Sequence, residues 1–276
     1  MPSLRRGPEA GLALLLALRR AARCPGGDER VSRVRLQGTA LEKRFGRVAA
    51  LRGVDFEIAA GESVAILGAN GAGKSTLLRI LAGLSRPSRG RFEAHADGCE
   101  TPLAREVLRG AVGYVGHASL LYGELTAREN LVFAGRLQGR PPERHQLDAL
   151  LDQFGLGDVS DRRAGTFSRG MTQRLAIARA IVHEPDLLLL DEPFTGLDEV
   201  STQRLVSQLG GLRADGRSLL LITHDPRRAI ELSDRALVLH RGQIRATPAR
   251  GDGFELEALR ETLTRLASED TVGSAA

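Results

Sequence analysis

The feature that most constrains the fold of this chain is a glycine-rich segment between an apolar run and a second, helix-like apolar stretch. Its residues are Gly68, Ala69, Asn70, Gly71, Ala72, Gly73, Lys74, Ser75 and Thr76. They match G-x-x-x-x-G-K-[ST], in which glycines let the backbone approach phosphate oxygens and the following helix favours negative charge. The chain has two lysines and 37 arginines, and a compact ammonium suits a phosphate cradle better than a planar guanidinium. A simple glycine-rich turn is the alternative, but the context predicts a phosphate-binding loop in which Ser75 can coordinate Mg²⁺.

A second apolar run, Leu187 to Leu190, ends in the acidic pair Asp191 and Glu192. Ligands of open α/β sheets bind at the carboxyl ends of the strands. We expect Asp191 to hold Mg²⁺, through its water or directly, and Glu192 to accept a proton from the attacking water. Such a pair alone is more typical of a loop start or a helix cap, but beside a phosphate loop the catalytic interpretation is favoured.

Strand-like and helix-like patterns alternate from Val34 onward, which predicts an α/β fold. The apolar or alternating runs span residues 54–58, 63–67, 111–115, 187–190, 218–223 and 236–240. Helical spacing is found at Leu147, Leu150, Leu151 and Phe154, and at Val206, Leu209 and Leu212. Residues 126–185 contain no comparable strand. We therefore expect a P-loop nucleotide-binding core at residues 31–248 that carries an inserted helical subdomain at about residues 118–183.

The two ends of the chain are expected to lie outside this core. Residues 1–30 are predicted to form a disordered extension, either dispensable or wrongly assigned, or in weak contact with a membrane surface. Their apolar run from Leu12 to Leu18 is too short to cross a bilayer. Residues 249–276 are predicted to form a C-terminal helix and tail. Cys24 and Cys99 are too few for a disulfide framework or a four-ligand zinc site, which favours a reducing compartment.

Three further motifs, in this order along the chain, resemble those of the ATP-binding subunits of ABC transporters. Residues 168–171, Ser-Arg-Gly-Met, resemble the family signature S-G-G-Q, with Ser168 and Gly170 matching and Arg169 and Met171 departing from it. Gly-Leu-Asp at residues 196–198 resembles the dimer-contact loop, and His224 the switch histidine that contacts the γ-phosphate. A histidine after a strand is otherwise most often a surface or core residue. The resemblance covers about residues 34–239 and implies the ABC ATPase type of P-loop fold.

Two aromatic positions have family counterparts. Phe45 stands where the family places a ring that stacks on adenine, although a strand-edge core residue is the alternative. His117 replaces a glutamine that, in the family, senses Mg²⁺ and touches the membrane partner. Imidazole is a poor ligand for Mg²⁺, so we expect His117 to hydrogen-bond a metal-bound water and make coupling sensitive to pH. The alternative is that His117 caps the strand end and touches the membrane subunit.

The combination of motifs most resembles that of the ATPase subunit of the haem exporter used in cytochrome c maturation. The ATPases of multidrug or polysaccharide exporters share several of these motifs. The resemblance implies ATP and Mg²⁺ as cofactors, Lys74, Glu192 and His224 as catalytic residues, and Ser75 and Asp191 as metal ligands. It also implies a head-to-tail dimer with a second, identical subunit. In that dimer each ATP lies between the phosphate loop of one copy and Ser168, Gly170 and Asp198 of the other. Integral membrane subunits would be the partners, at the cytoplasmic face of the inner membrane.

Two other classes of function remain as alternatives. The net charge of +5 is spread along the chain and aromatics make up 4% of residues, so no nucleic-acid partner is expected. ABC ATPases that act on nucleic acids would carry coiled-coil inserts, zinc cysteines or a second copy of the domain, and the sequence shows none of these. A non-hydrolysing nucleotide-binding module is the other alternative.

Overall fold

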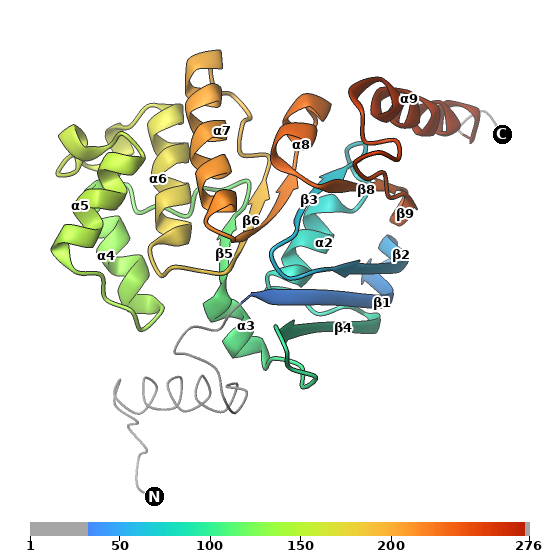
Figure 1. Cartoon of the computed structure of the whole chain (residues 1–276), viewed down its shortest axis with the longest axis horizontal. Helices are drawn as coiled ribbons and strands as arrows, with labels where there is room; N and C mark the ends of the chain where they lie inside the picture. Colours follow the sequence, from blue (N-terminus) through green and yellow to red (C-terminus); the bar gives the residue numbers. More distant parts are fainter. Residues whose placement is uncertain (1–32, 274–276) are drawn as a thin grey trace, which may run out of the picture.

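The computed structural model describes residues 33–273. The expected N-terminal extension, including its apolar run, lies outside the described residues. The described chain forms two β-sheets with a block of helices at one side (Figure 1). No helix in this part of the chain is long and apolar enough to span a membrane.

The larger sheet is the predicted α/β core. Its six strands lie in the order β5-β6-β7-β3-β8-β9, parallel except for the last pair. They are β3 Ser63–Leu67, β5 Val112–Val115, β6 Leu187–Asp191, β7 Ser218–Ile222, β8 Arg235–His240 and β9 Gln243–Ala246. Every residue of β3, β6 and β7 is buried. Continuous apolar runs are typical of parallel strands covered on both faces, which is why the sequence predicts these three strands to within one residue at either end.

The smaller sheet is antiparallel and has the order β2-β1-β4. Its strands are β1 Val34–Phe45, β2 Val48–Ile58 and β4 Arg89–Ala96. Helix α2, Lys74–Leu81, packs in a core cluster that combines side chains from both sheets. Cys99 lies just after β4.

The segment between β5 and β6 is helical, and Figure 1 shows it at the left of the molecule. It contains α4 Ala127–Leu137, α5 Arg144–Gln153, the short 3-10 turns η1 Gly157–Val159 and η2 Ala164–Thr166, and α6 Arg169–Ile181. Leu147, Leu151 and Phe154 are buried in one cluster with α6 and α7, while Leu150 is half-buried against it. Helix α3, Arg105–Ala111, leads directly into β5.

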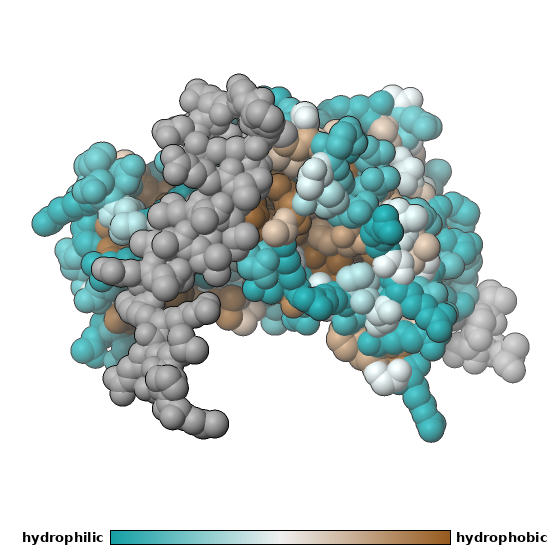
Figure 2. Space-filling view, turned by 90° about the horizontal axis from the view of Figure 1, so that it is seen from below, coloured by the Kyte–Doolittle hydropathy of each residue, from teal (hydrophilic) through white to brown (hydrophobic). Residues whose placement is uncertain are grey.

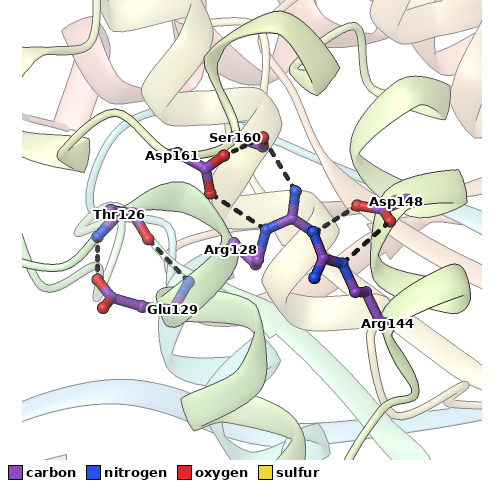
Figure 3. Close-up of polar contacts among 7 residues, drawn as sticks. All are labelled: Thr126, Arg128, Glu129, Arg144, Asp148, Ser160 and Asp161. Carbon is purple, nitrogen blue, oxygen red and sulfur yellow. Dashed lines mark hydrogen bonds and ion pairs between the residues drawn. The ribbon is translucent and has the colours of Figure 1, made fainter.

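Arg128 ties this helical block together. Its guanidinium pairs with Asp148 of α5 and with Asp161, 3.2 Å away, and donates to the Ser160 hydroxyl at 3.1 Å (Figure 3). Thr126 starts α4 with a capping box, because its hydroxyl accepts from the backbone N–H of Glu129, whose carboxylate accepts from that of Thr126. The loop after η1 is thereby fixed to two helices.

Three helices complete the described chain: α7 Glu199–Ala214, α8 Pro226–Leu232 and α9 Leu256–Gly273. The residues predicted to be helical from their spacing in α7, Val206, Leu209 and Leu212, are all buried. Helix α9 lies within the segment predicted to hold a C-terminal helix, and its Leu259 and Leu266 are buried against β3, β8 and α8.

Candidate functional site

The strand order brings three of the predicted motifs to one edge of the parallel sheet. Strands β6, β7 and β3 are neighbours and run in the same direction. The chain leaves β3 into the glycine-rich loop, β6 into Glu192, and β7 into Thr223 and His224. Because the carboxyl ends of parallel strands meet at one edge, these side chains share the position where open α/β sheets bind ligands.

The glycine-rich loop has a backbone conformation that demands its glycines. Gly68, Gly71 and Gly73 have φ angles of 140°, 79° and 104°, a region that side chains with a Cβ rarely adopt. A Cβ on Gly68 would lie 2.1 Å from the carbonyl oxygen of Leu239, and one on Gly73 would lie 2.4 Å from that of Ala50. The loop therefore fits tightly against neighbouring backbone. Ala69, Asn70 and Gly71 at its tip are exposed, and Ser75 and Thr76 in the first turn of α2 are half-buried.

Lys74 is the first residue of α2 and is 7% exposed. Its Nζ donates hydrogen bonds to the carbonyl oxygens of Gly68, at 2.7 Å, and Ala69, at 2.9 Å. Burial lowers the pKa of Lys74, whereas the charges of Glu192 and Asp191 raise it in opposition. The ammonium therefore lies within the electrostatic field of both predicted carboxylates.

Glu192 combines three features that are typical of a reacting group. Its φ of 54° is unusual for a residue with a side chain. Burial raises the pKa of its carboxyl, although His224 and Lys74 act in the opposite direction. Its Oε1 lies 2.9 Å from Nε2 of His224, and the backbone N–H of His224 also hydrogen-bonds to this carboxylate. A proton acceptor and an imidazole therefore stand side by side at this edge of the sheet.

The remaining members of this group differ in exposure. Asp191, the last residue of β6, is 7% exposed. His224 has a side chain that is 52% exposed, so the solvent side of the site is open at this residue. Phe45 ends β1 and is 54% exposed, with Nζ of Lys43 at 5.2 Å from its ring centroid. Its strand pairs with β2, whose Ala50 touches Gly73, so the hairpin that carries Phe45 borders the loop.

The predicted signature residues form a second group at the start of α6. Ser168 is the N-cap of this helix, and its hydroxyl accepts from the backbone N–H of Met171 at 3.3 Å. A Cβ on Gly170 would lie in ordinary contact with Leu197 and Ser201. Asp198 caps α7 by accepting from the N–H of Ser201 at 2.7 Å, and this hydrogen bond lowers the pKa of its carboxyl. Among the described residues, neither Ser168 nor Asp198 hydrogen-bonds to the phosphate loop.

His117 lies two residues beyond the end of β5, at the same edge of the sheet but on its outermost strand, and it is exposed. The predicted water contact and pH sensitivity of this residue remain predictions.

A wall of the site that sequence reasoning missed comes from the turn after β8. Gly242 donates to the carbonyl oxygen of Ala72 at 3.0 Å, and Leu239 contacts Gly68. The only signal in the sequence was the glycine after a strand-like run, which indicates a turn but no partner.

The fold and the site together define a P-loop nucleotide-binding protein, and comparisons identify its family. A profile described as ABC transporter matches residues 51–195. The ABC transporter ATP-binding protein NatA of Bacillus subtilis is 39% identical over 71% of this chain and 80% of its own length. The daunorubicin/doxorubicin resistance protein DrrA of Streptomyces peucetius is also 39% identical, over 79% of this chain and 66% of its own length. The sulfate/thiosulfate import protein CysA of Methylococcus capsulatus is 40% identical, over 74% of this chain and 60% of its own length. The chain belongs to the ABC transporter family, as an ATP-binding subunit.

Solved structures agree with this assignment. The ATP-binding cassette MJ0796, in a dimeric post-hydrolysis state with ADP and phosphate, superimposes with a TM-score of 0.69 and 27% identity over 78% of this chain and 98% of that one. The structure of an ATP-binding subunit of an ABC transporter superimposes with a TM-score of 0.73 and 31% identity, over 84% of this chain and 99% of that one. The predicted fold class is confirmed, and the chain is an ABC-type ATPase.

Proposed function

We propose that this chain is the ATP-hydrolysing subunit of an exporter whose membrane-spanning subunits are separate chains, and that haem for cytochrome c maturation is its cargo. The observation that carries the ATPase part is the convergence of the glycine-rich loop, the pair Asp191 and Glu192, and His224 at one sheet edge. The cargo rests on the motif resemblance alone.

The residues at this edge fit ATP and Mg²⁺. Any side chain at Gly68 or Gly73 would fill the space against Leu239 and Ala50, so the loop keeps the narrow backbone curve that surrounds phosphate oxygens. The hydroxyl of Ser75 and the carboxylate of Asp191 are oxygen donors, which Mg²⁺ prefers. They would hold the ion, which when bound supplies positive charge against the phosphate oxygens.

Each catalytic residue then has a defined task. Lys74 would offset the charge on the phosphates, and its position is fixed by the carbonyls of Gly68 and Ala69. Glu192 would accept a proton from the attacking water through its carboxylate, whose Oε1 lies beside His224. His224, beside that oxygen, would contact the γ-phosphate. Phosphoryl transfer needs mostly positioning and charge stabilisation from protein, and these three side chains come from three adjacent elements that provide both.

A second, identical subunit would complete the site. Ser168 and the tip of the phosphate loop are exposed, so both surfaces are accessible in one chain. In a head-to-tail dimer, the start of α6 of one copy would face the nucleotide held by the other copy, as the resemblance implies. The dimeric MJ0796 structures are the related precedent.

The membrane partner would bind at an apolar groove that is lined in part by Leu120, three residues after His117. Among the described residues, five of the eight exposed large hydrophobic side chains line one cavity of about 390 Å³: Leu84, Leu120, Tyr122, Phe133 and Leu137. Figure 2 shows hydrophobic residues at the surface near the middle of the face seen from below. Exposed apolar surface that is gathered in one place marks a binding site for protein or membrane.

Hydrogen bonds and ring packing within this chain support the wall of the groove. The amide of Asn130 is 1% exposed and hydrogen-bonds to the backbone of Tyr122, Leu125 and Thr126. The ring of Tyr122 packs edge-on against that of Phe133 with centroids 4.9 Å apart. A segment of an integral membrane subunit, docked here, would hold the ATPase at the cytoplasmic face of the inner membrane.

Purification of the tagged chain from detergent-solubilised membranes tests the partner, because a transport ATPase retains its membrane subunits. Phe133→Asp should lose them while keeping nucleotide binding, and Arg144→Asp, on the exposed surface of α5, is the control. For the cargo, cells without the gene should lose covalent haem in their c-type cytochromes, and wild type but not Glu192→Gln should restore it. Normal cytochromes with new sensitivity to drugs would instead favour a drug exporter, as the similarity to DrrA suggests.

A further inference from the structure

A cavity of about 410 Å³ lies between α5 and the C-terminal ends of α6 and α7. These three helices lie side by side (Figure 1) and share one core cluster. Two of the lining residues, Glu184 and Arg217, come shortly before β6 and β7. The nucleotide site lies at the carboxyl ends of the same strands, so this cavity is at the opposite edge of the sheet. A ligand bound here would not overlap with ATP.

The walls of the cavity suit a small molecule with an apolar body. Half of the lining residues are apolar, and among them Ile181 and Leu212 are buried while Leu150 is half-buried. The volume falls within the range of about 300–1,000 Å³ that is typical of small-molecule sites. Such sites combine apolar walls with a few polar groups that fix the orientation of the ligand.

Arg217 supplies a polar group without a partner. Its Nη1 is buried and has no hydrogen-bond partner, and its side chain makes no ion pair with any described residue. An unpaired buried donor lowers stability, so it calls for a physical explanation. A guanidinium binds the two oxygens of a carboxylate in a matching planar geometry. The unpaired Nη1 therefore points to an anionic group in the cavity.

The other charged residues of the lining limit how much negative charge this group can carry. Nη1 of Arg140 donates to the carbonyl oxygen of His183 at 2.7 Å, which holds a second cation at the cavity. Glu184 and Asp215 also line it; both are exposed, and neither forms an ion pair with the two arginines. Exposed carboxylates are solvated and need no partner, but they would repel a second negative charge. A single carboxylate is therefore favoured over a phosphate or a dicarboxylate.

We propose that this cavity binds a small monocarboxylate with an apolar body. Its carboxylate pairs with Arg217, and its apolar part packs on Leu150 and Leu212. The site is separate from the nucleotide site and does not depend on the proposed function. A ligand that binds only the folded chain also raises its stability by mass action.

The test is calorimetric titration of the full-length chain with octanoate, with octanol and octylamine as probes that have the same tail without the carboxylate. Octanoate should bind and raise the melting temperature, and the other two should bind at least about tenfold more weakly. Arg217→Met should weaken octanoate binding about 10-fold to 100-fold, the effect of losing a hydrogen bond to a charged group. Saturating ADP and Mg²⁺ should leave the affinity for octanoate unchanged, because the two sites are at opposite edges of the sheet.

Arg144→Met is the matched control, because Arg144 lies on α5, does not line the cavity and has a side chain that is 86% exposed. It should bind octanoate like wild type. Without octanoate, Arg217→Met should melt no lower than wild type, since the replaced side chain has no partner to lose. A lower melting temperature of Arg217→Met would overturn the inference, as would no binding of octanoate or equal binding by Arg217→Met. Loss of binding in Phe133→Asp would place octanoate in the apolar groove instead and would overturn it too.

Discussion

Glu192→Gln should abolish turnover while leaving ATP binding intact. The amide has nearly the same size as the carboxylate but cannot accept a proton from water at neutral pH. General-base catalysis contributes about 10²–10⁴ in rate, which corresponds to about 3–5 kcal/mol in the activation free energy. ATP binding should persist because Lys74 is positioned by backbone carbonyls and not by Glu192. The variant is therefore expected to accumulate as an ATP-bound dimer.

The assay is phosphate release at saturating ATP and Mg²⁺, combined with size-exclusion chromatography in ATP and in ADP. Glu199→Gln is the control, because Glu199 carries an exposed carboxylate seven residues further along that pairs with Arg228 at 2.9 Å. It should keep wild-type turnover. Undiminished phosphate release by Glu192→Gln would remove this carboxylate from the mechanism and refute the reasoning.

The pH dependence of the same variant follows from the burial of Glu192. Burial raises the pKa of its carboxyl above the usual 4.5, so the ionised, working form is lost at a higher pH than for an ordinary glutamate as the pH falls. As the pH is lowered, wild-type turnover should therefore begin to decline while the pH is still above 4.5. The residual rate of Glu192→Gln should stay constant over the same pH range. Because the pKa of Glu192 is higher in the folded protein than in the unfolded chain, the protonated carboxyl favours the folded state. This contribution to the free energy of unfolding is fully present below pH 4.5 and is lost as the pH rises through the pKa of the folded state. Glu192→Gln should then melt at a higher temperature than wild type near pH 8, with the difference shrinking towards acid pH.

Three further predictions concern the loop, the groove and the N-terminus. Lys74→Ala removes a buried ammonium that faces two carboxylates, and we expect a loss of at least about 3 kcal/mol, or about 100-fold, in ATP affinity measured with a fluorescent analogue. Asn130→Ala removes the acceptor of the Tyr122 backbone N–H and the hydrogen bonds that the side-chain amide donates to residues 122–126, so thermal unfolding should show a loss of about 1–3 kcal/mol. Deleting residues 1–30 should change neither ATPase activity nor folding, since β1 begins at Val34. A soluble full chain with an insoluble truncated one would show instead that the apolar run from Leu12 to Leu18 packs on the domain.

The parallel sheet could be predicted because its strands are buried on both faces and read as unbroken apolar runs. Of the antiparallel sheet, only residues 54–58 of β2 could be predicted, from their alternation of buried and exposed side chains. Strand β1 alternates buried and exposed residues only in part and contains irregularities in pairing between Gly38 and Leu41. Ala40 there has a φ of 47°, and its N–H donates to the carboxylate of Asp55 on β2. A partner distant in sequence fixes this conformation, so no local pattern predicts it.

In the site, too, some features follow from the local sequence and others depend on residues that are distant along the chain. The motifs identify Lys74, Asp191 and Glu192 individually, because their chemistry is local. That β6, β7 and β3 are adjacent is a property of the sheet order, which brings His224 to Glu192 from 32 positions along the chain. The contacts of Gly242 with the loop and of Arg169 with Thr195 also depend on this order. Neither residue carries a periodic pattern that would reveal its partner.

Ser168 and Asp198 illustrate how a residue can cap a helix and still serve a site in a second subunit. As N-caps, both use an oxygen to accept a backbone N–H. A hydroxyl that accepts one hydrogen bond still has its own O–H to donate, so Ser168 can hold the start of α6 in place and donate to a phosphate oxygen of the partner's ATP. Aspartate, asparagine and threonine are also good caps, but an aspartate would repel the phosphates and an asparagine would project its amide differently. Asp198, a carboxylate without a proton to donate, can only accept, so its role in the dimer would be to receive an N–H or a cation from the other copy. On the same side of the proposed interface, the two capping residues are thus suited to different partners: a phosphate oxygen for Ser168, and a donor group of the other copy for Asp198.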